Sequence, residues 1–145
     1  MTPRPAPWWA GQQALRVRGC GVRVLVAARD ARVRRALSRL LESDGDRVVG
    51  ATDAPGLLPE LDAELGPDLV VLELDRREHG QDLSAVRSLA GRGRAVIAVC
   101  GAATSRAAVL AAGALACLDE DADFPDRLVE AVRAVPGPRT SAPPP

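Results

Sequence analysis

The stretch LVVLELDRREHG, Leu69 to Gly80, sets one acid among apolar residues before the chain turns to charged residues. That acid is Glu73, and Asp75 follows it two positions later. A carboxylate in this position raises the question of whether it takes part in chemistry. The answer depends on which other groups the fold brings to it.

The sequence offers few other reactive groups. The chain has nineteen basic residues, all arginine, so a mechanism that needs a lysine amine is excluded. Its three cysteines, Cys20, Cys100 and Cys117, form no CxxC pair, and His79 is the only histidine, so no zinc spacing is present. We expect reduced, buried thiols at positions 100 and 117, with a redox switch as the alternative. Neither a phosphate loop nor a nucleophile elbow occurs, which argues against an enzyme.

Composition predicts one globular domain in the cytoplasm. Hydrophobic residues make up 47% of the 145 residues and charged residues 26%, and the formal net charge is zero. A neutral chain lacks the basic field that attracts nucleic acid or an anionic membrane. No apolar run is long enough for a signal peptide or a membrane span.

Proline marks two tails outside the folded part. Residues 1–21 carry three prolines and the pair Trp8 and Trp9, and residues 136–145 are rich in proline. We expect the folded domain at 22–135 and a flexible N-terminal extension. The tryptophan pair is consistent either with docking or with a disordered tail.

Within 22–135, apolar runs alternate with amphipathic segments. We expect strands at 22–28, 47–51, 68–74, 95–100 and 114–118. We expect helices from Asp30 to Gly45, at 55–65, at 82–90, after Thr104 and from Pro125. The arginines of the first helix should form a solvated face. This alternation predicts an α/β fold, a three-layer doubly wound sandwich around a five-stranded parallel sheet. Chemistry in such sheets lies beyond the carboxyl ends of the strands, at 28–30, 73–75, 100–101 and 118–121.

Three segments resemble one family. VRVLVAARDARVRRALSRLLES, GPDLVVLEL and AAGALACLDEDADFPDRLVEAVRAV are similar to the receiver (CheY-like) domain of two-component response regulators, and resemble the receivers of LuxR/NarL-type helix-turn-helix regulators. The resemblance covers residues 22–135 and implies strand order 2-1-3-4-5. It also implies a phosphorelay signalling role.

The resemblance implies a site that this chain has altered. Family members hold Mg²⁺ with two acids after the first strand, and here Ala28 and Arg29 stand in their place. The phosphoacceptor aspartate is replaced by Glu73. Cys100 takes the position of a threonine or serine, and Glu120 that of a lysine. The switch aromatic of the fifth strand is replaced by Cys117.

These replacements argue against Mg²⁺ binding and conventional phosphorylation. Ala28 supplies no oxygen ligand and Arg29 supplies a positive charge, whereas Mg²⁺ needs hard oxygen ligands. Three interpretations of Glu73 stay open. It pairs with Arg29, with Glu120 as a second partner for that arginine; it is a solvated strand-end charge; or it imitates a phosphorylated aspartate.

We therefore expect an atypical receiver-like signalling module that acts through protein contacts, without a cofactor or metal. A protein partner or a second copy would bind through the fourth helix, fifth strand and fifth helix, as the resemblance implies. One alternative is a receiver that still accepts phosphoryl at Glu73 or Asp75. A further alternative is the regulatory part of a transcription regulator that lacks its DNA-binding domain, because a Pro-rich decapeptide is too short for a helix-turn-helix.

Overall fold

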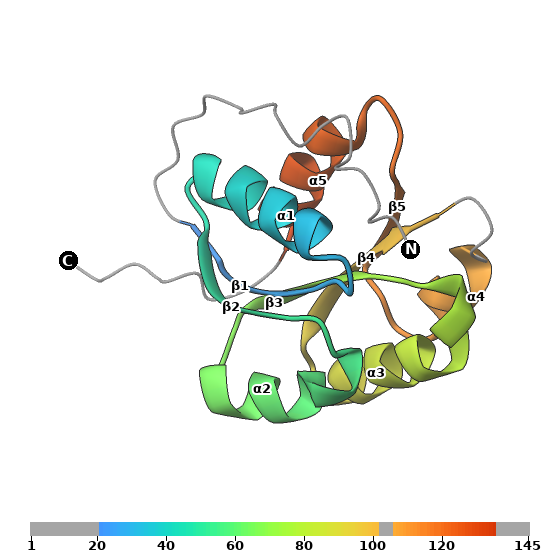
Figure 1. Ribbon diagram of the computed structural model, residues 1–145. Coiled ribbons are helices and arrows are strands. Elements are labelled where there is room, and N and C mark those ends of the chain that lie inside the picture. Colours follow the sequence, from blue (N-terminus) through green and yellow to red (C-terminus); the bar gives the residue numbers. More distant parts are fainter. Residues whose placement is uncertain (1–20, 102–105, 136–145) are drawn as a thin grey trace.

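Figure 1 shows the computed structural model, which describes residues 21–101 and 106–135. Its strands are β1 (Arg23–Ala27), β2 (Arg47–Thr52), β3 (Leu69–Glu73), β4 (Ala95–Cys100) and β5 (Ala116–Asp119). Its helices are α1 (Ala31–Ser43), α2 (Leu58–Leu65), α3 (His79–Gly91), α4 (Arg106–Ala111) and α5 (Phe124–Arg133). Two short 3-10 helices, η2 (Pro55–Leu57) and η3 (Arg76–Glu78), precede α2 and α3.

The five strands form one parallel sheet in the order β2-β1-β3-β4-β5, which confirms the predicted fold class and strand order. Helices α1 and α5 cover one face, and α2, α3 and α4 cover the other (Figure 1). The side chains of the central strands point alternately into two apolar clusters, one beneath each helical layer. All five residues of β3 are buried, which explains why its sequence is a nearly continuous apolar run.

Helix α1 begins where the sequence predicts. The carboxylate of Asp30 accepts hydrogen bonds from the backbone N–H groups of Arg32 and Val33, as expected of a helix cap. The solvated arginine face is only partly correct. Arg34 is half-buried and donates to the carbonyl oxygens of Ala28 (2.9 Å) and Arg29 (3.3 Å), so it braces the turn that follows β1.

The starts of α3 and β5 differ from the prediction by two or three residues. Helix α3 begins at His79, three residues before the expected start, because the polar residues of its first turn hide the helical pattern. Strand β5 begins at Ala116, two residues late, because the chain first turns at Gly113 and the N–H of Leu115 bonds to the carbonyl of Val96 (2.8 Å). Thr104, the expected helix cap, lies outside the described residues.

Buried aspartates hold distant segments together. Asp44, at the end of α1, pairs with Arg133 at the end of α5 (3.1 Å). Asp62 of α2 pairs with Arg94 (2.5 Å) and Arg92 (3.5 Å), which flank the turn between α3 and β4. Because buried carboxylates need charged or hydrogen-bonding partners, each pair fixes one helix against another part of the chain.

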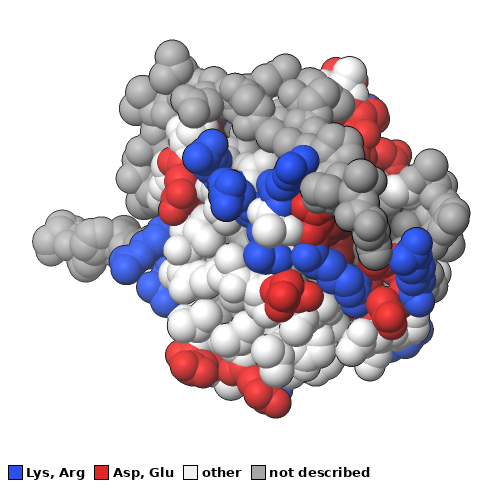
Figure 2. Space-filling view, in the orientation of Figure 1, with Lys and Arg blue, Asp and Glu red and all other residues white. Residues whose placement is uncertain are grey.

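The surface carries both signs of charge. Figure 2 shows basic and acidic side chains interspersed on one face, with basic groups over α1 and a broad uncharged area below them. No helix within 21–101 and 106–135 has the length and apolar character required to cross a membrane.

Replacing Gly113 with alanine is expected to destabilise the fold by about 1–3 kcal/mol. Its φ of +116° disfavours any side chain, and an added Cβ would lie 2.4 Å from the Cβ of Ala90 on α3. Urea unfolding measures the effect. Gly66 also has positive φ but nothing lies within 4 Å of an added Cβ, so Gly66→Ala isolates the backbone cost and should destabilise less. Equal losses in the two variants would contradict the close approach to Ala90.

Candidate functional site

The sequence-predicted site lies at the carboxyl edge of the sheet. Strands β1 and β3 are neighbours with Ala27 opposite Leu72, so Ala28 and Glu73 follow at the same edge. Ala28 is fully buried, and its N–H bonds to the carbonyl of Thr52 (3.0 Å). Glu73 is only 7% exposed. The fold therefore encloses the carboxylate that the sequence singled out.

Arg29 pairs with a carboxylate that the sequence analysis did not select. Its guanidinium donates two hydrogen bonds to Asp82 of α3, from Nη2 to Oδ1 (2.8 Å) and from Nη1 to Oδ2 (3.1 Å). The Asp82 side chain has no exposed surface, whereas that of Arg29 is 26% exposed. Such a bidentate pair combines charge with fixed geometry. The hypothesis that Arg29 locks against Glu73 was thus wrong about the partner, and Glu120 does not take that place either.

Asp82 also holds the chain that follows β3. Its Oδ2 accepts the backbone N–H of Asp75 (2.8 Å), while the N–H of Leu74 bonds to the carbonyl of Val99 (2.9 Å). The carboxylate of Asp75 in turn accepts the N–H of Arg77 (2.8 Å). One buried aspartate therefore joins the ends of β1 and β3 to α3.

The pair changes the electrostatics of Arg29. The pKa of its guanidinium is raised above its usual value, first by the hydrogen bonds to Asp82 and further by the charges of Asp82, Asp75 and Glu78, while burial acts in the opposite direction. Arg29 is consequently a fixed positive charge at this edge.

One signal in the sequence could have identified Asp82. Ala85, Val86 and Leu89 are the buried residues three, four and seven positions after it, so Asp82 occupies the apolar stripe of α3. An acid on such a stripe needs a partner inside the protein. Because the predicted helix begins at residue 82, Asp82 has the position of an ordinary acid in the first turn.

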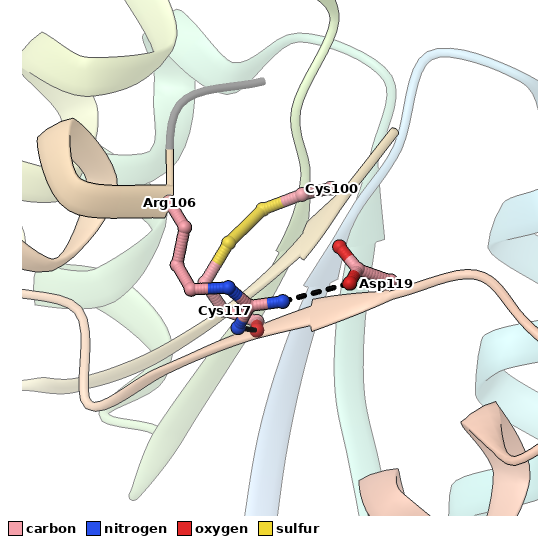
Figure 3. Close-up of a disulfide and its surroundings, with 4 residues drawn as sticks. All are labelled: Cys100, Arg106, Cys117 and Asp119. Carbon is pink, nitrogen blue, oxygen red and sulfur yellow. Dashed lines mark hydrogen bonds and ion pairs between the residues drawn. A yellow bond between two sulfur atoms is a disulfide. The ribbon is translucent and has the colours of Figure 1, made fainter. Parts of the chain in front are cut away.

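The cysteines differ from the expectation of separate thiols. Cys100 and Cys117 are buried, at 1% and 3% exposure, but they are joined by a disulfide with Cα atoms 6.3 Å apart (Figure 3). The register explains the pairing. Cys100 lies opposite Asp119 and Cys117 opposite Ala98 on the adjacent parallel strands, so the two cysteines are diagonal neighbours facing the same helical layer.

Arg106 attaches α4 to the same place. Its guanidinium donates to the carbonyl oxygen of Cys117 and pairs with Asp119 (2.7 Å), as Figure 3 shows. Glu120 follows Asp119 directly and is half-buried. Arg106 was not predicted from the sequence, because its contacts form only once β5 lies beside the start of α4.

The residues at the carboxyl edge do not suit Mg²⁺. Ala28 has no side-chain oxygen, and both oxygens of Asp82 are occupied by the guanidinium of Arg29. In the part of the chain that the structure describes, no three His, Cys, Asp or Glu side chains are grouped to bind a metal ion. The arrangement presents a cation where the resemblance implies metal ligands. Trp8 and Trp9 lie outside the described residues.

Comparison with known proteins supports the resemblance through structure alone. No protein-family model and no curated protein sequence matches the chain. Among solved structures, a LuxR-family two-component response regulator from Aurantimonas sp. SI85-9A1 has 25% identity and a TM-score of 0.69, covering 79% of this chain and 84% of that one.

Two further structures agree. The response regulator domain of Thermotoga maritima CheB has 22% identity and a TM-score of 0.68, over 79% of this chain and 96% of that one. The receiver domain of the putative response regulator NarL from Mycobacterium tuberculosis has 19% identity and a TM-score of 0.65, over 80% and 99%. The described part of this chain therefore has the fold of a response-regulator receiver domain.

Proposed function

We propose that this chain is an atypical receiver-like signalling module that acts through protein contacts without conventional aspartyl phosphorylation. The observation that carries the proposal is the pair between Arg29 and the buried Asp82. The pair holds the guanidinium of Arg29 where the resemblance implies two acids that bind Mg²⁺. A cation fixed there repels Mg²⁺, and neither oxygen of Asp82 is available as a ligand.

The phosphoacceptor position supports the same proposal. Glu73 is longer than aspartate by one methylene and is almost fully buried, so an in-line attack on an incoming phosphoryl group is poorly placed. With Glu120 in place of a lysine, no ammonium group is present to stabilise the transferred oxygens. An acyl-phosphate at Glu73 would lack the groups that form it and hold it.

The partner surface that we propose consists of α4, β5 and α5. Two of the exposed large apolar side chains lie here, Leu110 on α4 (42% exposed) and Leu115 just before β5 (53% exposed). Burying such side chains against a protein partner or a second copy is favourable. A protein bound to this surface would respond to the conformation of α4, β5 and α5.

Incubation with acetyl phosphate and Mg²⁺ tests the proposal. We expect the intact mass of the chain to stay unchanged, while a receiver that retains the acid pair, aspartate and lysine gains a phosphoryl group under the same conditions. A phosphoryl adduct that hydroxylamine removes would contradict the proposal and support a residual phosphoacceptor. Glu73→Gln and Asp75→Asn would then identify which carboxylate carries it.

A further inference from the structure

The disulfide connects two strands at the end where α4 is attached. Cys100 is the last residue of β4 and Cys117 the second residue of β5. The separation of their Cα atoms, 6.3 Å, lies within the range that disulfides span, so the backbone needs no movement to accept the bond. The bond closes a loop that contains the whole of α4.

Arg106 makes the disulfide and α4 one connected unit. Its guanidinium, at the first residue of α4, binds the carbonyl oxygen of Cys117 itself and the carboxylate of Asp119 two residues later. A shift of Cys117 therefore also displaces Arg106, the first residue of α4. Figure 3 shows the disulfide, Arg106 and Asp119 side by side across β4, β5 and the start of α4.

Among the described residues, helix α4 has few buried contacts, with Ala108 packed partly against the same apolar cluster as the two cysteines. It has six residues, of which Val109 alone is buried, and Ala112 adds a small contact just beyond its end. A helix this short is not stable by itself, so tertiary tethers decide its position. Segments with few buried contacts open locally at low free-energy cost, which gives a reagent access to the buried sulfurs.

We propose that Cys100 and Cys117 form a reversible thiol–disulfide switch, which determines whether α4 is held against β4 and β5. The reductant is a protein dithiol. Its thiolate attacks one sulfur of the disulfide to give a mixed disulfide, which its second thiol resolves. Two electrons and two protons reach Cys100 and Cys117 as two thiols, and the dithiol leaves as a disulfide. A protein disulfide reverses the reaction.

Reduction must move atoms in a packed region. A covalent sulfur–sulfur bond is shorter than any non-bonded contact between two sulfur atoms, so the two side chains have to separate when it breaks. Both lie in a close-packed apolar cluster that includes Val109 and Ala112, where a change of this size is felt by the neighbours. The displacement reaches α4 through Arg106 and alters the surface that carries Leu110.

The switch would stand even if Glu73 accepted phosphoryl, because its chemistry uses neither Glu73 nor Arg29. Its experiments measure thiols and backbone exchange and need no partner.

Counting thiols tests the bond. The full chain is equilibrated with mixtures of dithiothreitol and its oxidised form, then quenched and denatured. Its free thiols are alkylated, and mass spectrometry of the intact chain counts them. We expect one alkyl group, on Cys20, in the oxidised chain and three in the reduced chain, with a reversible transition between them. Three labels at every ratio, or a disulfide that resists every ratio while the protein stays native, would overturn the proposal.

Hydrogen exchange tests the consequence for α4. On reduction we expect amides in 106–119 to exchange faster by about tenfold or more, while those of β1 and β3 keep their rates. Equal rates in the two redox states would overturn the proposal. An equal acceleration of exchange throughout the chain would also overturn it, because the disulfide would then only stabilise the fold as a whole.

Single substitutions supply matched controls. Cys100→Ser and Cys117→Ser should each show the fast exchange of the reduced chain whatever the oxidant, and Cys20→Ser should keep the full redox response. Loss of the response in Cys20→Ser would assign the disulfide chemistry to another pair. If a serine variant does not fold, chemical reduction of the unchanged chain still gives the comparison.

Discussion

Replacing Arg29 with alanine is expected to lower the free energy of unfolding by about 3 kcal/mol. The substitution leaves the fully buried carboxylate of Asp82 without its bidentate partner and with the N–H of Asp75 as its remaining hydrogen bond. Removing one member of a buried pair is costly because the other charge stays uncompensated. Because Arg29 is about a quarter exposed, the lower end of the usual range applies. Urea unfolding measures the loss.

Two controls separate this pair from an ordinary surface contact. Arg127 pairs with Asp121 and Asp123 where all three side chains are largely exposed, so Arg127→Ala should cost about 0–1 kcal/mol. The double variant Arg29→Met, Asp82→Leu removes both charges and should recover much of the stability lost in Arg29→Ala. A loss below about 0.5 kcal/mol in Arg29→Ala would show that the pair is a weak surface contact.

Replacing Phe124 with alanine is expected to lower the free energy of unfolding by about 3–5 kcal/mol. Phe124 is the only phenylalanine of the chain, has no exposed surface, and packs where α1 and α5 meet the sheet. Loss of the ring removes apolar burial and leaves a cavity that the neighbours fill only in part. A domain of ordinary stability has about 5–15 kcal/mol in total, so the expected loss is a large part of it.

Phe124→Leu and Leu115→Ala are the matched comparisons. Leucine retains most of the volume and should cost about 1–1.5 kcal/mol. Leu115 is 53% exposed, and truncating it should change stability by less than about 0.5 kcal/mol. Thermal or urea unfolding ranks the stabilities of the three variants, Phe124→Ala, Phe124→Leu and Leu115→Ala. Similar losses for Phe124→Ala and Leu115→Ala would mean that the ring contributes no more than a surface side chain.

The sequence predicted the fold well because its strands are strongly patterned. The run from Leu69 to Leu72 in β3 is apolar throughout, and β4 coincides with the predicted 95–100. Helix ends were harder. The first turn of α3 has a polar composition, and only packing against the sheet shows that the helix already begins at His79.

The site was predicted less completely because its partners come from distant segments. Position alone placed Glu73, Ala28 and Cys100 at the carboxyl edge of the sheet. The partner of Arg29 could not be read from strand ends, because Asp82 lies on a helix and is 53 residues away in sequence. The disulfide depends on the register between β4 and β5, which no single-sequence pattern specifies.

The pair between Asp44 and Arg133 has a practical consequence. Strands of a parallel sheet all start at one edge, and α1 returns the chain to that edge before β2 begins. The contact with Asp44 places the end of α5 there too. A domain, tag or fluorophore fused next to residue 21 or residue 135 thus leaves from the edge opposite Glu73 and the disulfide. Both junctions are suitable attachment points for probes that must not obstruct either site.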